Sequence, residues 1–278
     1  MRIAMAMLAL AGLSGCEVER SKSNEPAIEA TPAALTFDGS DYSNETAKLA
    51  HGKRLARVLG CQGCHGDDFT GTNVTEDDPK FGDMNAPNLT LLLPAYSDAE
   101  LERVIRQGIP KDGREFWFMP SESYQFLSDP DLAALIAHLR TVKPAGKPMP
   151  PVRVGPGLRK QVADGIMANA AGMQVRYRNQ APPELGEAHV YGRRMAQIVC
   201  AECHNSSLQG FDGFTPSLDL AGAYNNAELE TLLTTGKGKA KPDLGLMTQS
   251  AQSRFSKLTP RERSAIIGYI KARADRPQ

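Results

Sequence analysis

Apolar residues along the chain recur mostly three and four positions apart, which is the spacing of residues on one face of a helix. This spacing is clear in residues 49–59 and 195–199, and the segments DLAALIAHLR (131–140) and ERSAIIGYIK (262–271) are apolar over most of their length. Runs that alternate between apolar and polar residues, as strands do, are scarce. The pattern therefore predicts an all-α protein that consists of short helices.

Local signals mark the ends of these helices. Ser128 and Asp131 stand at the start of the first long apolar segment, Thr259 and Glu262 stand at the start of the second, and both pairs have the spacing of a capping box. Two further helices are expected to begin at SDAELE and NNAELE, where Ser, Asp or Asn side chains can cap the first turn. Each of these two helices is expected to end at a glycine, the residue best suited to the left-handed conformation that follows a helix.

The two halves of the chain repeat each other. The segment AYSDAELERVIRQG (95–108) matches AYNNAELETLLTTG (223–236) without a gap, and the two long apolar segments match as well. Because the matches keep the same order in both halves, we expect two copies of one domain. We place the first domain at residues 44–143 and the second at residues 184–275.

Residues 144–183, between the two copies, are rich in Pro and Gly. Pro-Pro pairs and X-Pro steps favour an extended backbone, so we expect a linker here that crosses the surface of both domains. The stretch 157–173 within it could add a helix. The first copy also carries a longer loop, residues 72–85, whose acidic side chains are expected to face solvent.

The N-terminus has the features of a bacterial export signal. Arg2 precedes an apolar run of about a dozen residues, which is too short to span a bilayer. The run ends in Leu-Ser-Gly-Cys, which resembles the lipobox of bacterial lipoproteins; the resemblance implies cleavage before Cys16 and lipidation of this cysteine. We therefore expect a signal peptide over residues 1–15, a flexible tether over residues 16–43, and attachment to a membrane in the periplasm of a Gram-negative bacterium.

Composition narrows the possible functions. The chain has 278 residues, enough for two domains of ordinary size, and its basic and acidic side chains are equal in number at 32 each. A formal charge of zero argues against a nucleic-acid-binding protein that relies on bulk positive charge. Outside the N-terminal run, no stretch of the sequence is long and apolar enough for a transmembrane helix.

Four of the five cysteines lie in two CxxCH strings, CQGCH (61–65) and CAECH (200–204). Such a string suits a redox dithiol, half of a zinc site or a covalent haem attachment. A redox CxxC belongs between a strand and a helix, whereas a helix is predicted before each string here, and paired zinc-binding CxxC units normally lie closer together in sequence. In an oxidising compartment unmodified thiol pairs tend to form disulfides, so we expect these cysteines to be bonded to another group. The adjacent histidines favour two covalently bound haem c groups, with thioethers to Cys61, Cys64, Cys200 and Cys203 and proximal iron ligands His65 and His204.

The repeat also nominates the ligand on the other side of each iron. Met119 follows Gly108 at the same distance at which Met247 follows Gly236, and no other methionine has an equivalent in both halves. Core packing is the alternative role for these two methionines. A thioether ligand favours Fe(II), raises the reduction potential and closes the iron to small molecules. The other histidines do not align between the halves and are expected to be structural: His51, His138 and His189.

This order of motifs resembles the class I c-type cytochromes, and the lipid anchor makes the chain similar to two-haem, membrane-attached cytochrome subunits of periplasmic dehydrogenases. The resemblance implies that the carbonyls of Pro87 and Pro216 accept a hydrogen bond from the proximal imidazoles. It also implies that Gly52 and Gly192 lie where the first helix of each domain crosses the last. The aromatic residue that the family places opposite is Tyr269 in the second copy, and a histidine stands there in the first.

The predicted function is electron transfer, without enzymatic activity, from a dehydrogenase or quinol-oxidising complex to a respiratory acceptor such as an oxidase or another cytochrome. The alternative is an enzyme: a di-haem peroxidase or another haem-dependent oxidoreductase. A peroxidase needs one iron that is open to peroxide, and two well-placed methionines argue against that arrangement.

Overall fold

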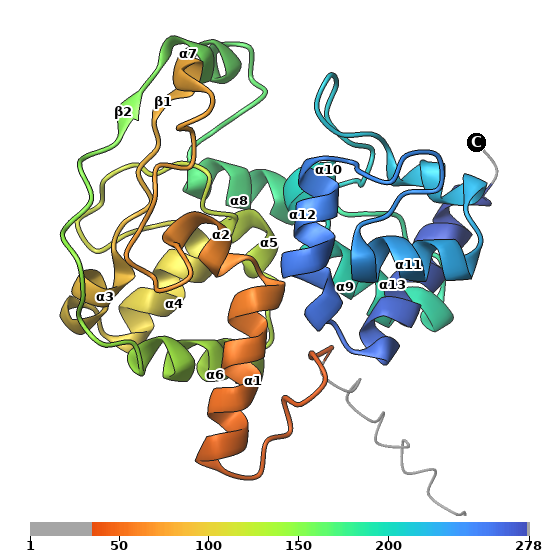
Figure 1. Ribbon diagram of the computed structural model, residues 1–278, viewed down its shortest axis with the longest axis horizontal. Helices are drawn as coiled ribbons and strands as arrows, with labels where there is room; N and C mark the ends of the chain where they lie inside the picture. Colours follow the sequence, from red (N-terminus) through yellow and green to blue (C-terminus); the bar gives the residue numbers. More distant parts are fainter. Residues whose placement is uncertain (1–34, 277–278) are drawn as a thin grey trace, which may run out of the picture. The chain divides into compact units, whose positions relative to one another are not determined.

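Helices make up most of the secondary structure in the computed structural model, which describes residues 35–276 (Figure 1). The prediction of an all-α fold is confirmed. The α-helices are α1 (Glu45–Val58), α2 (Cys61–His65), α3 (Leu89–Leu92), α4 (Asp98–Gln107), α5 (Ser121–Tyr124), α6 (Asp129–Arg140), α7 (Pro156–Ala163), α8 (Ala170–Arg178), α9 (Val190–Val199), α10 (Ala201–His204), α11 (Asn226–Thr235), α12 (Leu246–Ser253) and α13 (Pro260–Ala274). Short 3-10 turns η1 (Pro79–Phe81), η2 (Leu93–Ala95), η3 (Glu187–His189), η4 (Leu218–Ala223) and η5 (Phe255–Lys257) complete the helical elements. Contacts join both halves into one compact unit, so the domain boundaries given above stay a prediction.

The first and last helices of each half cross at a glycine. In the first half α1 packs against α6, and a Cβ atom added to Gly52 would lie 1.9 Å from the Ala134 carbonyl oxygen. In the second half α9 packs against α13, and a Cβ atom added to Gly192 would lie 2.0 Å from the Ala265 carbonyl oxygen. No side chain fits at either crossing. The close approach expected from the family resemblance is therefore present in both halves.

The predicted helix ends are largely observed. Ser97 and Asn225 cap α4 and α11 as full capping boxes, and both helices end at glycines in the left-handed conformation. Thr259 and Glu262 form the expected capping box of α13. The corresponding box of α6 is incomplete: Ser128 accepts the N–H of Asp131, but the Asp131 carboxylate does not return to the Ser128 backbone.

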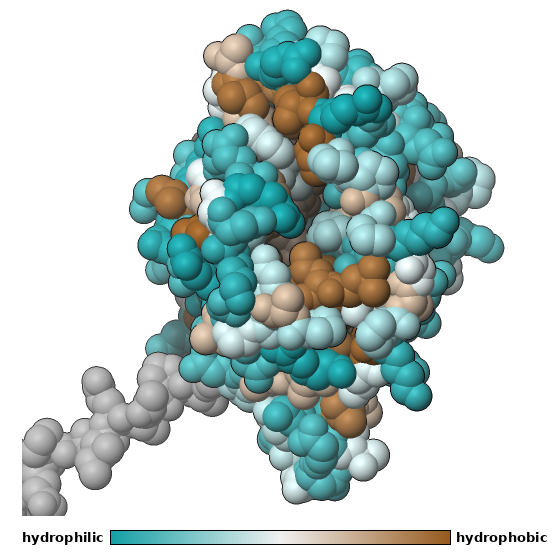
Figure 2. Space-filling view, turned by 90° about the vertical axis from the view of Figure 1, so that its left-hand side faces the viewer, coloured by the Kyte–Doolittle hydropathy of each residue, from teal (hydrophilic) through white to brown (hydrophobic). Residues whose placement is uncertain are grey.

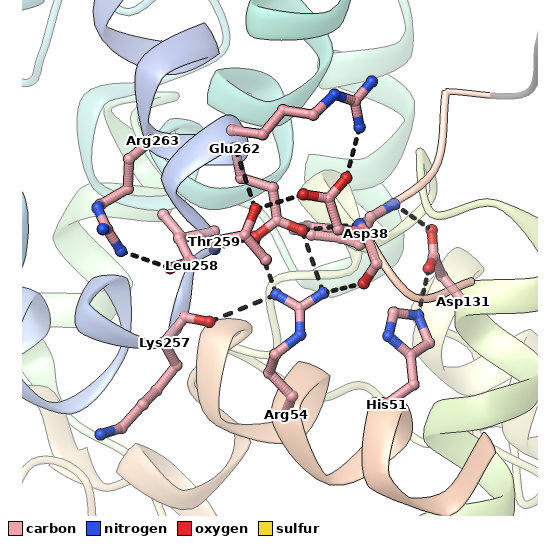
Figure 3. Close-up of polar contacts among 11 residues, drawn as sticks. Asp38, His51, Arg54, Asp131, Lys257, Leu258, Thr259, Glu262 and Arg263 are labelled. Carbon is pink, nitrogen blue, oxygen red and sulfur yellow. Dashed lines mark hydrogen bonds and ion pairs between the residues drawn. The ribbon is translucent and has the colours of Figure 1, made fainter. Parts of the chain in front are cut away.

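The Asp131 carboxylate instead binds the N-terminal end of the described chain (Figure 3). The Phe37 N–H donates to Asp131 Oδ2 at 3.1 Å, and the Asp38 N–H donates to Glu262 Oε1 at 2.9 Å. These two carboxylates hold equivalent positions at the start of α6 and α13. Arg54 of α1 adds an ion pair with Glu262 at 2.8 Å. Phe37 and Asp38, which we call the clasp, thus link the last helices of the two halves.

The clasp corrects one sequence-based expectation. The tether predicted for residues 16–43 does not extend to Phe37, whose side chain is only 1% exposed and lies in the hydrophobic core. The physical reason is local: an apolar ring and two backbone donors find partners where the two halves meet. The predicted signal peptide (1–15), the lipidation site Cys16 and the tether up to residue 34 lie outside the described residues.

The linker is more structured than its Pro and Gly content indicates. The helix considered for residues 157–173 is two helices, α7 and α8, and strand β2 (Arg153–Val154) pairs antiparallel with β1 (Gly82–Asp83) in the 72–85 loop. Helix α8 packs mainly against α5. Its residue Tyr177 is buried and donates its hydroxyl to the Ala201 carbonyl at 3.4 Å. The linker therefore contributes core residues rather than only connecting two domains.

The face seen in Figure 2 is mostly hydrophilic, with apolar side chains in small separate groups. Scattered apolar residues of this kind are normal for a protein surface. Among the residues that the structure describes, no helix has both the length and the apolar character needed to span a membrane.

Candidate functional site

The first CxxCH string forms a short helix directly after α1. The chain turns at Gly60, which has a left-handed φ of 78°, and then forms α2 from Cys61 to His65. A left-handed turn of this kind costs a glycine little because glycine has no Cβ atom. The turn places both cysteines and the histidine on one compact coil, with the histidine buried and the cysteines partly exposed.

The second string has the same layout with different turn residues. Helix α9 continues through Cys200 into α10, which ends at His204. The turn after the string uses Asn205 at φ 60° where the first half uses Gly66 at φ 78°. Asparagine is among the few other residues that enter this region with little cost. Within residues 35–276 all four cysteines are free thiols, none of them in a disulfide.

Each histidine of the two strings makes the same hydrogen bond. His65 Nδ1 lies 3.0 Å from the Pro87 carbonyl oxygen, and His204 Nδ1 lies 2.8 Å from the Pro216 carbonyl oxygen. A carbonyl can only accept, so Nδ1 carries the proton and Nε2 keeps its lone pair. Neither Nε2 atom has a hydrogen-bond partner among the described residues.

Electrostatics keep both imidazoles neutral. Burial lowers the pKa of His65 and of His204, and the bond to the proline carbonyl only partly offsets it. A neutral imidazole with a free Nε2 lone pair, oriented by a bond from its other nitrogen, is the form that ligates a metal. The donor set therefore fits the iron of a haem held by the adjacent cysteines.

The loops after the two strings match in their backbone contacts. The N–H of Gly71 donates to the His65 carbonyl at 2.8 Å, and the N–H of Gly210 donates to the His204 carbonyl at the same distance. The hydroxyl of Thr72 donates to the Cys64 carbonyl at 2.7 Å. Thr215 makes the equivalent bond to Cys203. These contacts hold the carbonyl ends of both strings in the same way.

Two strained residues also match. Phe69 has φ 64° and Leu208 has φ 61°, in equivalent loop positions. Left-handed φ values are unfavourable for bulky residues and persist only where the surroundings enforce them. Each carbonyl accepts a backbone N–H at 2.9 Å, from Leu89 in one half and from Leu218 in the other. No sequence signal marked these residues, because both are ordinary apolar side chains that are buried in the core.

The two candidate distal methionines lie near the start of equivalent helical segments. Met119 precedes α5, and Met247 lies in the first turn of α12. Both side chains are partly buried and pack against the hydrophobic core. Their role as iron ligands stays a prediction.

The thiols are not set up for dithiol chemistry. Burial raises the pKa of Cys61 and of Cys200 to about 12, and that of Cys64 and of Cys203 to about 11. Redox-active cysteines need a lowered pKa, because the thiolate is the reactive form. These values argue against a redox dithiol in either half.

One charged pair near both strings was missed by the sequence reasoning. Arg254 Nη2 lies 3.0 Å from Glu202 Oε2, and Arg254 Nε donates to the Val58 carbonyl at 3.2 Å. Glu202 is inside the second string, whereas Val58 ends the helix before the first. The repeat contains a usable signal: Arg254 aligns with Ser123, and Glu202 aligns with Gly63. Charges that break a repeat indicate a contact that one copy lacks.

Glu122 of α5 is a second buried acidic residue that the sequence did not reveal. It is 9% exposed, and burial together with the nearby Glu202 raises its pKa to about 8. Its carboxyl group is therefore mostly protonated near neutral pH.

Comparison with known proteins agrees with this geometry. Residues 49–143 match the family model described as Cytochrome c. The chain is 24% identical over 310 aligned positions to the fructose dehydrogenase cytochrome subunit of Gluconobacter japonicus, an alignment that covers 97% of this chain and 58% of that protein. It is also 30% identical over 112 positions to a subunit of the nicotinate dehydrogenase of Pseudomonas putida, over 37% of this chain and 9% of that protein. The chain thus spans just over half the length of the first relative and a small part of the second.

The match and the site define a class. Residues 49–143 match the Cytochrome c family, whose domains carry electrons on covalently bound haem c. The prediction of an electron carrier rather than an enzyme is confirmed at this level. By its sequence the chain is similar to the cytochrome subunit of one dehydrogenase and to a subunit of another.

Proposed function

We propose that the chain is a membrane-anchored di-haem c-type cytochrome that passes electrons from a dehydrogenase or a quinol-oxidising complex to a respiratory acceptor. Haem iron changes between Fe(III) and Fe(II) and so supplies one-electron transfer when the group is bound. The first haem is attached at Cys61 and Cys64 with His65 as its proximal ligand. The equivalent residues for the second haem are Cys200, Cys203 and His204.

The observation that carries this proposal is the matched pair of histidine-to-proline hydrogen bonds. The bonds from His65 to Pro87 and from His204 to Pro216 differ by only 0.2 Å, at 3.0 and 2.8 Å. Each bond sets the tautomer and the ring direction, which a metal ligand requires and a surface histidine does not. Since both halves have the same bond, we assign the same role to both.

Met119 and Met247 are the proposed distal ligands. A soft thioether ligand together with an imidazole would favour Fe(II) and raise the reduction potential. With a histidine and a methionine both bound to each iron, no position would remain for a substrate. This ligand set suits electron transfer and disfavours peroxidase chemistry.

A lipid at Cys16 would keep the cytochrome at a membrane in the periplasm, where donor and acceptor complexes lie. A single lipid anchor followed by a flexible tether would leave the domains free to reach their partners. The similarity to dehydrogenase subunits favours a dehydrogenase as the electron donor. The acceptor is an oxidase or another cytochrome.

Haem counting tests the proposal. Purified protein should contain two haems per chain that resist extraction with acid acetone, measured by the pyridine haemochrome assay and protein mass. The double variant Cys61→Ala/Cys64→Ala should retain one haem, and Cys200→Ala/Cys203→Ala should retain the other. The matched control Cys16→Ala should keep two haems and leave the membrane fraction. One haem or none in the unaltered chain would contradict the proposal.

A further inference from the structure

We propose that Arg254 is a charge shared by both haem sites, where it holds the two CxxCH strings against each other and tunes both reduction potentials. This inference rests on the proposed function, because it requires a haem in each half. Arg254 is a positioning residue outside the haem cradle, the name we give to the histidine, proline and loop threonine that repeat in both halves.

The contacts of Arg254 join the second string to the residues just before the first. Its Nη2 atom faces Glu202 of the second string at 3.0 Å, and its Nε donates to Val58 at 3.2 Å, just before the first string. The guanidinium also lies against Gly60, where an added Cβ atom would be 2.7 Å from Nε. The planar guanidinium presents several donors in a fixed arrangement, so one side chain can contact both halves.

The contacts of Arg254 lie next to the cysteines of both sites. Gly60, against which the guanidinium lies, directly precedes Cys61, and Glu202 lies between Cys200 and Cys203. A single ion pair is therefore adjacent to the attachment points of both haems.

The surroundings make the influence of this ion pair strong. The side chain of Arg254 is 13% exposed and that of Glu202 is 26% exposed. Charges that are shielded from water interact over longer distances than charges on the surface. Fe(III) haem has one more positive charge than Fe(II) haem, so a nearby cation favours the reduced form and raises the potential. A nearby anion lowers it.

The sequence repeat shows that the pair is not part of the haem cradle itself. The first half has Ser123 at the position of Arg254 and Gly63 at the position of Glu202. A cradle residue would be present twice, as the histidines, prolines and loop threonines are. One copy of the pair, placed where the halves meet, is what a shared element requires.

Charge variants with opposite expected signs test the proposal. Arg254→Gln leaves Glu202 without its cation, so both midpoint potentials should fall. Glu202→Gln leaves Arg254 without its anion, so both should rise. We expect each potential to move by about 59 mV, which corresponds to a tenfold change in the ratio of oxidised to reduced haem for a one-electron couple. Spectroelectrochemical titration of the full-length di-haem protein measures both steps, and Met119→Leu and Met247→Leu assign each step to its half.

Two further variants separate charge from packing. Arg254→Lys keeps the charge and loses the fixed donor geometry. Both potentials should therefore equal those of the unaltered protein, while the melting temperature should stay lower. Arg54→Gln is the matched control: Arg54 pairs across the halves with a buried carboxylate, at 2.8 Å, but among the described residues it makes no hydrogen bond or ion pair with either string. It should lower stability and leave both potentials unchanged.

Several results would overturn the proposal. A shift confined to the second haem would make Glu202 and Arg254 local to that half, and equal shifts in the Arg54→Gln control would show that loosened packing is the cause. If Arg254→Gln fails to fold, the test rests on Glu202→Gln: unchanged midpoint potentials in that variant would reject the proposal. Fewer than two haems in the unaltered chain would reject the proposed function instead, whereas two haems with unmoved potentials would reject only the role of Arg254.

Discussion

Around His65 and His204 the two halves make the same hydrogen bonds through matching residues, whereas the contact of Arg254 with Val58, which joins the halves, has no repeated counterpart. The turn after each string is Gly66 in one half and Asn205 in the other, yet both have left-handed φ values and lead into the same carbonyl contacts. The contacts that join the halves use Arg254 where the repeat has Ser123.

The difference separates two kinds of selection on side chains. Cradle residues need a particular backbone path, so glycine and asparagine are exchangeable as long as φ is positive. A residue that joins the halves needs a particular charge in its own half, and the equivalent position in the other half does not need that charge. Asp131 and Glu262 show both kinds at once: each stands at the same position in the first turn of the last helix of its half, and each also holds one residue of the clasp. Departures from the repeat are therefore the best guide to contacts between the copies.

The largest expected effect comes from the distal ligands. Met119→Leu and Met247→Leu should each remove one thioether-to-iron charge-transfer band and lower one reduction potential, because leucine offers no donor atom. Optical spectra and redox titration measure both quantities.

Met84→Leu is the matched control for the ligand variants. Met84 is 3% exposed and buried in the first half, without an equivalent in the second. It should leave the band and both potentials unchanged. Persistence of both bands in Met119→Leu and Met247→Leu would reject the distal assignments, and the core-packing role would then be the better interpretation.

The helix crossings should give the next largest effect, and the same one in both halves. Gly52→Ala and Gly192→Ala place a methyl group 1.9 and 2.0 Å from a backbone carbonyl oxygen, so the helices must move apart. We expect each change to lower the unfolding free energy by about 3 kcal/mol, the upper end of the usual cost of overpacking. Denaturant titration followed by circular dichroism measures this loss.

Gly268→Ala controls for helix propensity. Gly268 lies in α13, and an added Cβ atom there meets nothing within 4 Å. Alanine should stabilise the helix by about 0.5–1 kcal/mol relative to glycine. If Gly52→Ala proved as harmless as Gly268→Ala, the close crossing in the first half would be refuted.

Much of this fold could be predicted because its signals are local or repeated. The helix ends near Ser97 and Asn225 follow from spacing and from alignment of the two halves. The glycines at the crossings follow from the resemblance to the class I c-type cytochromes. The clasp could not be predicted in this way. Phe37 lies in a stretch without helical or strand periodicity, and its burial depends on partners far along the chain. The same reason hid the pairing of Arg254 with Glu202 and the strand pair β1–β2.

The clasp gives the third prediction. Phe37→Ala removes a ring that is 1% exposed, and the loss of buried apolar surface should lower the unfolding free energy by about 3 kcal/mol. Phe214→Ala makes the same change at a ring that is 65% exposed and should alter stability by no more than about 0.5 kcal/mol. Equal effects of the two variants in thermal unfolding would show that the clasp does not stabilise the contact between the halves.

The last prediction is a pH dependence that only one half contributes. Burial raises the pKa of Glu122 to about 8, above its ordinary value of 4.5, so folding favours the protonated form. The stabilisation is fully present below pH 4.5 and is lost as the pH rises towards 8, because the unfolded chain releases the proton in this range and the folded chain does not. The contribution changes by at most about 1.4 kcal/mol per pH unit.

Glu122→Gln should remove this slope, because the amide stays neutral at every pH. Thermal unfolding of both proteins at a series of pH values from 5 to 8 gives the comparison, and Glu187→Gln, a change at an exposed carboxylate of the second half, should leave the slope unaltered. The position that aligns with Glu122 in the second half is Ser253, which has no charge to titrate. A slope that persists in Glu122→Gln would mean that a group other than Glu122 takes up the proton.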